Sequence, residues 1–132
     1  MKTLTKAEEQ IMQCIWQVKK GFLKDIMDQL PDPKPAYTTV ATIINTLIRK
    51  NFVSYKPYGK LREYFPRVTR NIYFAGQVKG IVRNFFNNSY SQFASTFTDD
   101  NLSLTELEEL RQLFDEQIEK QKKDKWIWVL TW

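Results

Sequence analysis

The chain has 132 residues, of which 42% are hydrophobic and 27% charged, and its formal net charge is +5. This length predicts one ordinary domain, or a small domain with an appendage. A single cysteine and no histidine exclude an intrachain disulfide and a Cys/His zinc site, so we expect no metal and no cofactor. The composition also offers no evident pair of nucleophile and base, and we do not expect an enzyme.

The charge is distributed unevenly along the chain. Residues 1–70 carry 13 Lys and Arg against 6 Asp and Glu, whereas residues 71–132 carry 7 against 9. This asymmetry favours a polyanion as the partner of the N-terminal part and a different role for the rest. The N-terminus shows no signal-peptide pattern, and no apolar run approaches the roughly 18 residues that a membrane span needs. We therefore expect a cytoplasmic protein without membrane insertion.

Two helices are predicted before residue 31. The first begins at Thr5, whose hydroxyl can cap the helix while Glu8 completes a capping box, and it ends at Gly21. The second is short, from about residue 24 to residue 30, and the prolines of residues 31–35 end it. A helix, a short helix, a turn and a third helix follow one another in the order of a helix-turn-helix motif.

The third helix, within residues 35–50, has two contrasting faces. Its apolar side consists of Val40, Ile43, Ile44 and Leu47. Its polar side presents short hydroxyl and amide groups that run into Arg49 and Lys50, which suits the major groove of DNA. Threonine methyls can contact thymine methyls, asparagine can bond adenine, and cations can bind phosphate. We predict base reading by Thr38, Thr39, Thr42 and Asn45, and backbone contacts by Thr46, Arg49 and Lys50.

Two strands are predicted after this helix, joined by a turn at residues 57–60. Lys56, Lys60 and Arg62 lie around the turn and are predicted to contact the DNA backbone, which makes residues 1–70 a winged helix-turn-helix DNA-binding domain. Threonines on a helix and a basic hairpin also occur on ordinary solvated surfaces. Threonine is a poor helix former, however, so four threonines within residues 38–46 favour DNA contact.

Residues 71–121 are predicted to form a C-terminal helical dimerisation region. The predicted helices cover residues 71–88, 90–97 and 102–121, and Ser103 with Glu106 forms a capping box at the start of the last. These helices either pack on the first domain or exchange apolar faces with a second chain. We favour a homodimer because helix-turn-helix proteins are usually two-fold dimers. The predicted dimerisation residues are Ile72, Val78, Val82, Phe85, Leu107, Leu110, Leu113 and Phe114.

Residues 122–132 form a separate tail that is first basic and then rich in tryptophan. It holds three of the four tryptophans, and its residues alternate with a period of two. This alternation is compatible with an edge strand, a dimer clasp or a peptide that docks on a partner. A disordered end without a role is an equal alternative.

Several segments, in their order and spacing, resemble the penicillinase repressor family over roughly residues 3–121. The resembling segments are residues 4–9 with Trp16, residues 37–43, the wing, residues 64–66 and residues 101–111. The resemblance implies a mainly α fold with a small β-hairpin wing, and a dimer that represses antibiotic-resistance genes by covering a palindromic operator on double-stranded DNA. By position, it implies that Thr38, Thr39 and Thr42 read bases.

The resemblance also implies a membrane-bound sensor protease as a partner, which relieves repression by cutting the dimerisation region. By spacing, the cleavage region falls at Ser95, Thr96 and Phe97, where the Asn-Phe pair of the family is not present. The tail lacks the C-terminal cysteines of the copper-responsive branch, so we do not expect copper sensing. A second function stays open: a winged-helix protein-interaction module without specific operator binding. The operator, the regulated genes and the inducing signal are not evident from the sequence.

Overall fold

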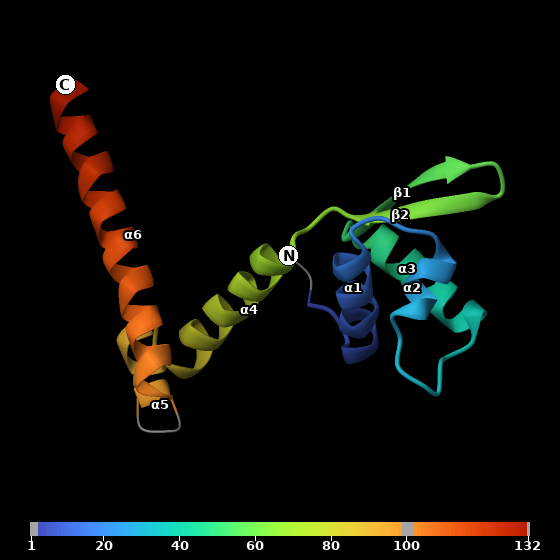
Figure 1. The fold of residues 1–132 in the computed structure, drawn as a ribbon, viewed down its shortest axis with the longest axis horizontal. Coiled ribbons are helices and arrows are strands. Elements are labelled where there is room, and N and C mark those ends of the chain that lie inside the picture. The colour runs from blue at the N-terminus through green and yellow to red at the C-terminus, as the bar shows by residue number, and fades with distance from the viewer. Residues whose placement is uncertain (1–2, 99–101, 132) are drawn as a thin grey trace. The chain divides into compact units, whose positions relative to one another are not determined.

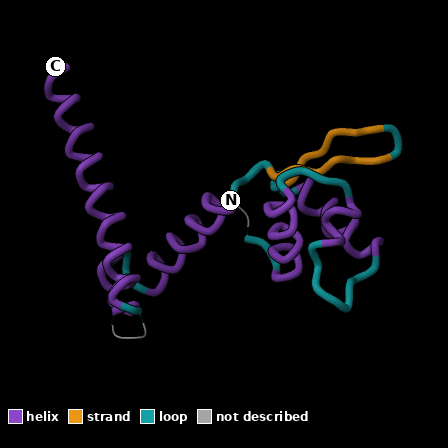
Figure 2. Tube along the Cα trace, viewed as in Figure 1, coloured by secondary structure: helices purple, strands orange, loops and turns teal. Residues whose placement is uncertain are grey.

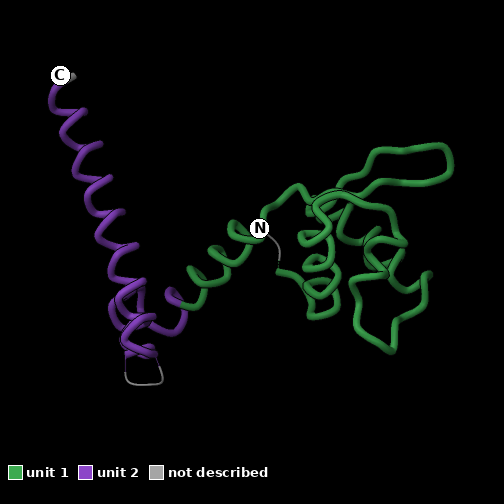
Figure 3. Tube along the Cα trace, viewed as in Figure 1, with its two compact units in different colours: residues 1–81 green, residues 82–132 purple. Residues whose placement is uncertain are grey.

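The computed structural model describes residues 3–98 and 102–131 and divides into two compact units, Met1–Ile81 and Val82–Trp132 (Figure 3). The first unit contains α1 (Lys6–Val18), α2 (Leu23–Asp28), α3 (Tyr37–Arg49), β1 (Val53–Tyr58) and β2 (Leu61–Pro66) (Figure 1). Helix α4 (Arg70–Phe85) begins in the first unit and ends in the second, which also holds α5 (Tyr90–Thr98) and α6 (Leu104–Thr131). The predicted winged helix-turn-helix followed by a helical C-terminal region is confirmed (Figure 2). Asn101 and Trp132, which the sequence analysis used, lie outside the described residues.

The core of the first unit lies between α1, α3 and the base of the hairpin. Ile15 of α1 and Ile44 of α3 are fully buried, as is Ile26 of α2, while Phe52 closes the core where the hairpin begins. Burial of each such side chain is worth about 1.5–3 kcal/mol relative to exposure. Cys14 belongs to the same cluster, and burial raises the pKa of its thiol. The apolar side predicted for α3 is thus the face that attaches this helix to the domain.

The predicted start of α1 is confirmed, but its predicted end is wrong. The Thr5 hydroxyl accepts a hydrogen bond from the Glu8 amide at 3.1 Å, and the Glu8 carboxylate accepts one from the Thr5 amide at 2.9 Å. The helix ends at Val18, with Lys19 in the left-handed region at φ 68°. Gly21 instead exchanges two backbone hydrogen bonds with Tyr64, of 3.0 and 2.8 Å, and so joins the base of β2 to the segment before α2.

Helix α2 ends earlier than predicted, and a lysine binds carbonyls at its C-terminal end. It runs from Leu23 to Asp28, and the Lys34 ammonium donates to the carbonyls of Met27 and Leu30 at 2.9 and 2.7 Å. These carbonyls lie at the C-terminal end of the helix, where backbone acceptors lack helical partners and a cation is favourable. The lysine within the proline-rich segment therefore fixes the turn between α2 and α3.

Strands β1 and β2 form an antiparallel hairpin in which Tyr58 lies opposite Leu61. Only Gly59 and Lys60 remain for the turn, and Gly59 has φ +61°, a value that suits the first central position of a type II′ turn. At the other end of the hairpin, Val53 is buried in the core. The hairpin is consequently held at its base, while its exposed end carries the turn (Figure 2).

The first turns of α4 pack on α1 and extend the first unit to Ile81. Tyr73 is fully buried, and its hydroxyl donates to the Glu9 carboxylate at 2.8 Å while it accepts from the Leu4 amide at 3.3 Å. Burial and the contact with Glu9 raise the pKa of this phenol. The Trp16 and Phe74 rings lie 6.0 and 5.0 Å from the Tyr73 ring. Residues beyond 70 are therefore part of the core of the first unit.

The second unit contains aromatic rings in edge-to-face contact and a long helix. The ring of Phe93 on α5 lies 5.6 Å from that of Phe86 and 5.1 Å from that of Phe97. The capping box predicted for α6 is confirmed, because Ser103 and Glu106 exchange hydrogen bonds of 3.2 and 3.3 Å. Helix α6 then continues as far as Thr131, so the edge-strand interpretation of the tail is wrong. Residues 104–131 contain neither Gly nor Pro, so the helix continues through the basic segment of residues 122–125 without a break.

Candidate nucleic-acid interface

The polar face of α3 is exposed over its whole length, while its opposite face is buried. Val40, Ile44 and Leu47 are inaccessible to solvent, which fixes the orientation of the helix about its own axis. The four residues predicted to read bases are all exposed on the other side: Thr38, Thr39, Thr42 and Asn45. The structure thus places the predicted base-reading residues together on the surface of the basic unit.

Backbone and side-chain hydrogen bonds order this face before any ligand binds. The Thr42 hydroxyl donates to the Thr38 carbonyl at 2.9 Å, and the Thr46 hydroxyl donates to the Thr42 carbonyl at 3.2 Å. Each bond bridges one helical turn, a local pattern that fixes the χ1 rotamer of the threonine. Arg49 continues the series, since its guanidinium donates to the Thr46 hydroxyl at 3.0 Å. The predicted backbone contact Arg49 is therefore held beside the base-reading residues.

Lys50, which the sequence predicts to contact the DNA backbone, is bound to a carboxylate of its own chain. Its ammonium lies 2.8 Å from both carboxylate oxygens of Glu8, and its side chain is only 23% exposed. Glu8 itself is 5% exposed. Burial works to raise the pKa of Glu8, but the hydrogen bonds from Lys50 and Thr5 outweigh it and hold the pKa below its ordinary value of 4.5. Lys50 therefore ties the end of α3 to the start of α1.

The hairpin carries the remaining predicted cations at its exposed end, but not on one face. Lys56 pairs across the sheet with Glu63, and Arg62 pairs with Pro57. Successive residues of a strand point to opposite faces, so Lys56 and Arg62 project from opposite faces of the hairpin. Lys60 occupies the turn between them. The three cations surround the tip of the wing instead of forming a single basic stripe.

Tyrosine rings on the wing support two of these cations. The Arg62 guanidinium lies 4.2 Å from the centre of the Tyr55 ring, and the Lys56 ammonium lies 5.4 Å from that of Tyr58. Such contacts are worth about 0.5–1 kcal/mol at exposed sites and favour extended side chains along the strands. Sequence reasoning identified the cations but not these aromatic supports, although the alternation of tyrosine and basic residues was visible.

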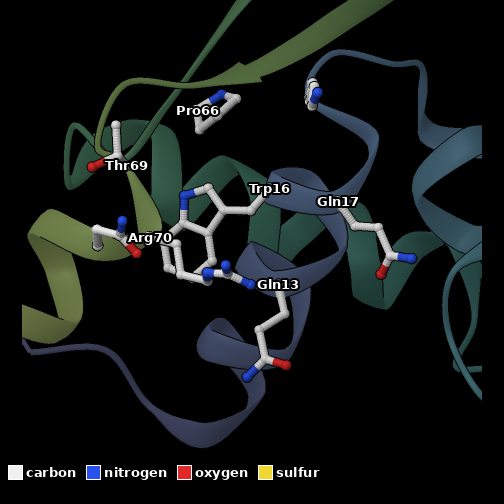
Figure 4. A pocket seen from close by; sticks show the side chains of 8 residues that line it. Gln13, Trp16, Gln17, Pro66, Thr69 and Arg70 are labelled. Atoms are coloured by element: carbon white, nitrogen blue, oxygen red, sulfur yellow. The ribbon is translucent and has the colours of Figure 1, made fainter. Parts of the chain in front are cut away.

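A hollow of about 580 Å³ lies beside Trp16, away from the residues predicted to contact DNA (Figure 4). The Trp16 indole donates to the Val68 carbonyl at 2.8 Å, which fixes the ring between α1 and the segment that follows β2. Polar side chains of Gln13, Gln17 and Arg70 also line the hollow (Figure 4). This hollow therefore marks the joint between the wing, α1 and α4, where α4 is attached to the first unit.

The predicted dimerisation residues differ in their exposure. Val82 is buried within its own chain, while Val78 and Leu110 are partly covered. The others leave much of their side-chain surface exposed, notably Ile72, Phe85, Leu107, Leu113 and Phe114. An apolar hollow of about 480 Å³ lies between α5 and α6, with Leu107, Leu110 and Phe114 along its α6 side. The structure therefore leaves an apolar surface on α6 that its own unit does not cover.

The residues of the predicted cleavage region lie on α5. Ser95, Thr96 and Phe97 are exposed, and the two hydroxyls donate to carbonyls of the preceding turn at 2.6 and 2.7 Å. In the parts of the chain that the structure describes, no cluster of three or more His, Cys, Asp or Glu residues is arranged to hold a metal ion. Over the same residues, no helix combines the length and the apolar character that crossing a membrane requires.

Comparison with known proteins gives a consistent result. The family model described as penicillinase repressor matches residues 4–116. The methicillin resistance regulatory protein MecI of Staphylococcus aureus (strain N315) is 23% identical over 116 residues, which cover 86% of this chain and 94% of that protein. MecI of Staphylococcus epidermidis gives the same values, and MecI of Mammaliicoccus sciuri is 22% identical over the same coverage. The match includes both the winged unit and the first part of α6.

Proposed function

The chain belongs to the penicillinase repressor family of transcriptional repressors, and on this premise we propose that it is a homodimer that binds a palindromic operator on double-stranded DNA. One observation carries the proposal. Thr38, Thr39, Thr42 and Asn45 share an exposed face of α3, while the opposite face is buried in the core. A helix held in this way can enter the major groove with its polar side toward the base edges.

The proposed roles follow from the chemistry and position of each side chain. The four residues on the exposed face of α3 read bases, since their hydroxyl, methyl and amide groups match the groups that base pairs present in the major groove. The phosphate contacts come from Thr46 and Arg49 on α3 and from the wing cations Lys56, Lys60 and Arg62. Lys50 acts through Glu8 and keeps α3 in place, because its ammonium is already bound to that carboxylate.

The proposed dimer rests on the apolar surface of α6. Leu113 and Phe114 are 61% and 62% exposed, and Leu107 lies about two turns before Phe114 on the same side of the helix. A single helix reads only a few base pairs, so a monomer would bind weakly. Two chains joined through α6 would place two α3 helices on one DNA molecule, and the second contact would become intramolecular.

The relatives named as methicillin resistance regulators support a role in controlling antibiotic-resistance genes. We extend the proposal to release by a membrane-bound sensor protease that cuts at Ser95–Phe97. A cut there would separate α6, with its apolar surface, from the DNA-binding unit. Insertion of a site for a sequence-specific protease after Thr98 tests this consequence: cutting the purified protein should abolish operator binding. Full binding after complete cutting would contradict the proposed release.

Selection from random duplexes tests the proposed function directly. The full chain is incubated with a random-sequence duplex library, the bound fraction is amplified over several rounds, and the enriched duplex is titrated against a scrambled one. We expect an enriched palindrome with half-sites about one helical turn apart and an affinity about 10³-fold or more above that for the scrambled duplex. A library that stays unenriched would instead support the protein-interaction module. Footprinting upstream of the chain's own gene then identifies the natural operator.

A further inference from the structure

Helix α6 carries two apolar regions that are separated by a polar segment. The first, from Leu107 to Ile118, is a stripe along one side of the helix, and the second is the run of residues 126–130. Residues 119–125 between them carry four lysines against Glu119 and Asp124. The family match ends at residue 116, so the second region, which we call the terminal apolar segment, lies beyond it. The family match therefore assigns no function to this segment.

The terminal apolar segment is apolar around the whole helix. Its five residues are Trp126, Ile127, Trp128, Val129 and Leu130, and all are more than half exposed. Consecutive residues of an α-helix are turned by about 100°, so five in a row occupy every side. A second helix covers only a stripe, as it would along the first region. A surrounding apolar medium, in contrast, covers all sides of a helix end at once.

The charges and the aromatic residues identify that medium. Lys120, Lys122, Lys123 and Lys125 directly precede the segment, and such juxtamembrane lysines are attracted to anionic lipid head groups. Tryptophan is enriched at the level of the head groups, where its ring is half apolar and half polar. The segment is about 7.5 Å long at 1.5 Å per residue, far less than the hydrocarbon core of about 30 Å, so its insertion is limited to the boundary between head groups and acyl chains.

We propose that residues 120–130 form a lipid-binding element that attaches the protein to the surface of an anionic membrane. The terminal apolar segment enters the head-group region, and the preceding lysines bind the lipid phosphates. A membrane crossing is not involved, because a span needs about 20 apolar residues. Two elements in the proposed dimer would act together on one membrane. The lipid contact itself does not depend on DNA binding or on the proposed repressor function.

Vesicle binding by the full chain tests the element. The probes are vesicles of phosphatidylcholine alone and vesicles with phosphatidylglycerol, and the readouts are co-sedimentation and a blue shift of tryptophan fluorescence. We expect at least tenfold stronger binding to the anionic vesicles, together with the blue shift. Trp126→Ser/Trp128→Ser should remove the shift and weaken binding at least tenfold. Lys122→Gln/Lys123→Gln should weaken binding roughly fivefold per lysine.

A matched control separates this element from other surfaces of the chain. Leu104→Ser also removes an exposed apolar side chain from α6 and should leave vesicle binding unchanged. The basic first unit can adsorb to anionic vesicles by charge alone, but this would not require Trp126 and Trp128. Vesicle binding that is unchanged in Trp126→Ser/Trp128→Ser would therefore overturn the proposal, as would dissociation of the dimer by these changes without any lipid binding. Operator binding by this variant, measured without lipid, reports separately on the proposed function.

Discussion

The two units of this chain differ in how completely they bury their own apolar residues. In the first unit, buried side chains from Leu4 to Tyr73 form one continuous cluster. Among the described residues of the second unit, Val82 alone is buried, and exposed apolar side chains follow α6 to its end. Exposed apolar surface of this extent usually marks an interaction site. The first unit thus has a core of its own, whereas the second leaves apolar surface that the proposed dimer would cover.

The largest expected effect comes from placing a charge on the uncovered surface of α6. Phe114→Asp should give monomers whose first unit stays folded but whose operator affinity falls by about 10²-fold or more, because a desolvated charge is costly and the gain from linking two readers is lost. Sedimentation and DNA titration measure the two effects. Gln112→Asp introduces the same charge on the opposite side of the helix and should retain the dimer. If the wild-type protein is itself a monomer, the proposed dimer through α6 is contradicted.

The next effect concerns the core of the first unit. Glu8→Ala removes the capping box and leaves the Lys50 ammonium without its carboxylate, so we expect the free energy of unfolding to fall by about 2–4 kcal/mol. Because the pKa of Glu8 is lowered in the folded state, its contribution is complete above pH 4.5 and is lost as the pH falls through the lowered pKa. Urea unfolding at pH 7 and at acidic pH measures this. Equal losses in Glu8→Ala at both pH values would argue against the ion pair.

A smaller effect is expected for a single base-reading residue. Thr42→Ala should weaken operator binding by about 1–3 kcal/mol and leave binding to random DNA nearly unchanged, because base contacts specify whereas phosphate contacts position. Titrations on both duplexes measure the difference. Thr42→Val retains a methyl group while it removes the hydroxyl, so it shows which group matters. Equal losses on the two duplexes would remove Thr42 from the base-reading set.

The last effect is expected at the wing and concerns the salt dependence of DNA binding. Lys60→Gln/Arg62→Gln should flatten the dependence of log affinity on log salt by up to about four units per dimer, since each phosphate contact contributes about 0.9 to the slope. Titrations between low and moderate salt measure the slope. Lys56 and Arg62 project from opposite faces of the wing. Only the cations that lie near the DNA should therefore contribute to the salt slope. A slope equal to that of the unchanged protein would show that the wing does not reach the phosphates.

The elements of the first unit were predictable because their signals are local. The capping box at Thr5, the apolar side of α3 and the wing turn each depend on residues that are close in sequence. The structural role of Lys50 could not be predicted in this way, since Glu8 lies 42 positions away and nothing near Lys50 distinguishes it from Arg49. The hydrogen bonds of Gly21 with Tyr64 are equally remote in sequence. From the sequence alone, Gly21 therefore indicates the end of the first helix and not the backbone partner of Tyr64.

The tail shows a different limit of sequence reasoning. Alternation of period two indicates a strand only if another strand is available to pair with it. Residues 104–131 lack a helix-breaking residue, so the helix that begins at Leu104 continues through the alternating segment. The predicted base-reading residues, by contrast, were placed together because one helix with one buried side carries all of them. Local periodicity thus located the candidate site but not the end of the last helix.

The hydrogen bonds within α3 bear on the choice of base pairs in the proposed operator. The hydroxyl hydrogen of Thr42 is directed to the Thr38 carbonyl, so this side chain offers the groove only oxygen lone pairs and a methyl group. Such groups complement the amino groups of adenine and cytosine and the methyl group of thymine, but not the acceptor edge of guanine. The base opposite Thr42 in the half-site should accordingly be adenine, cytosine or thymine and not guanine.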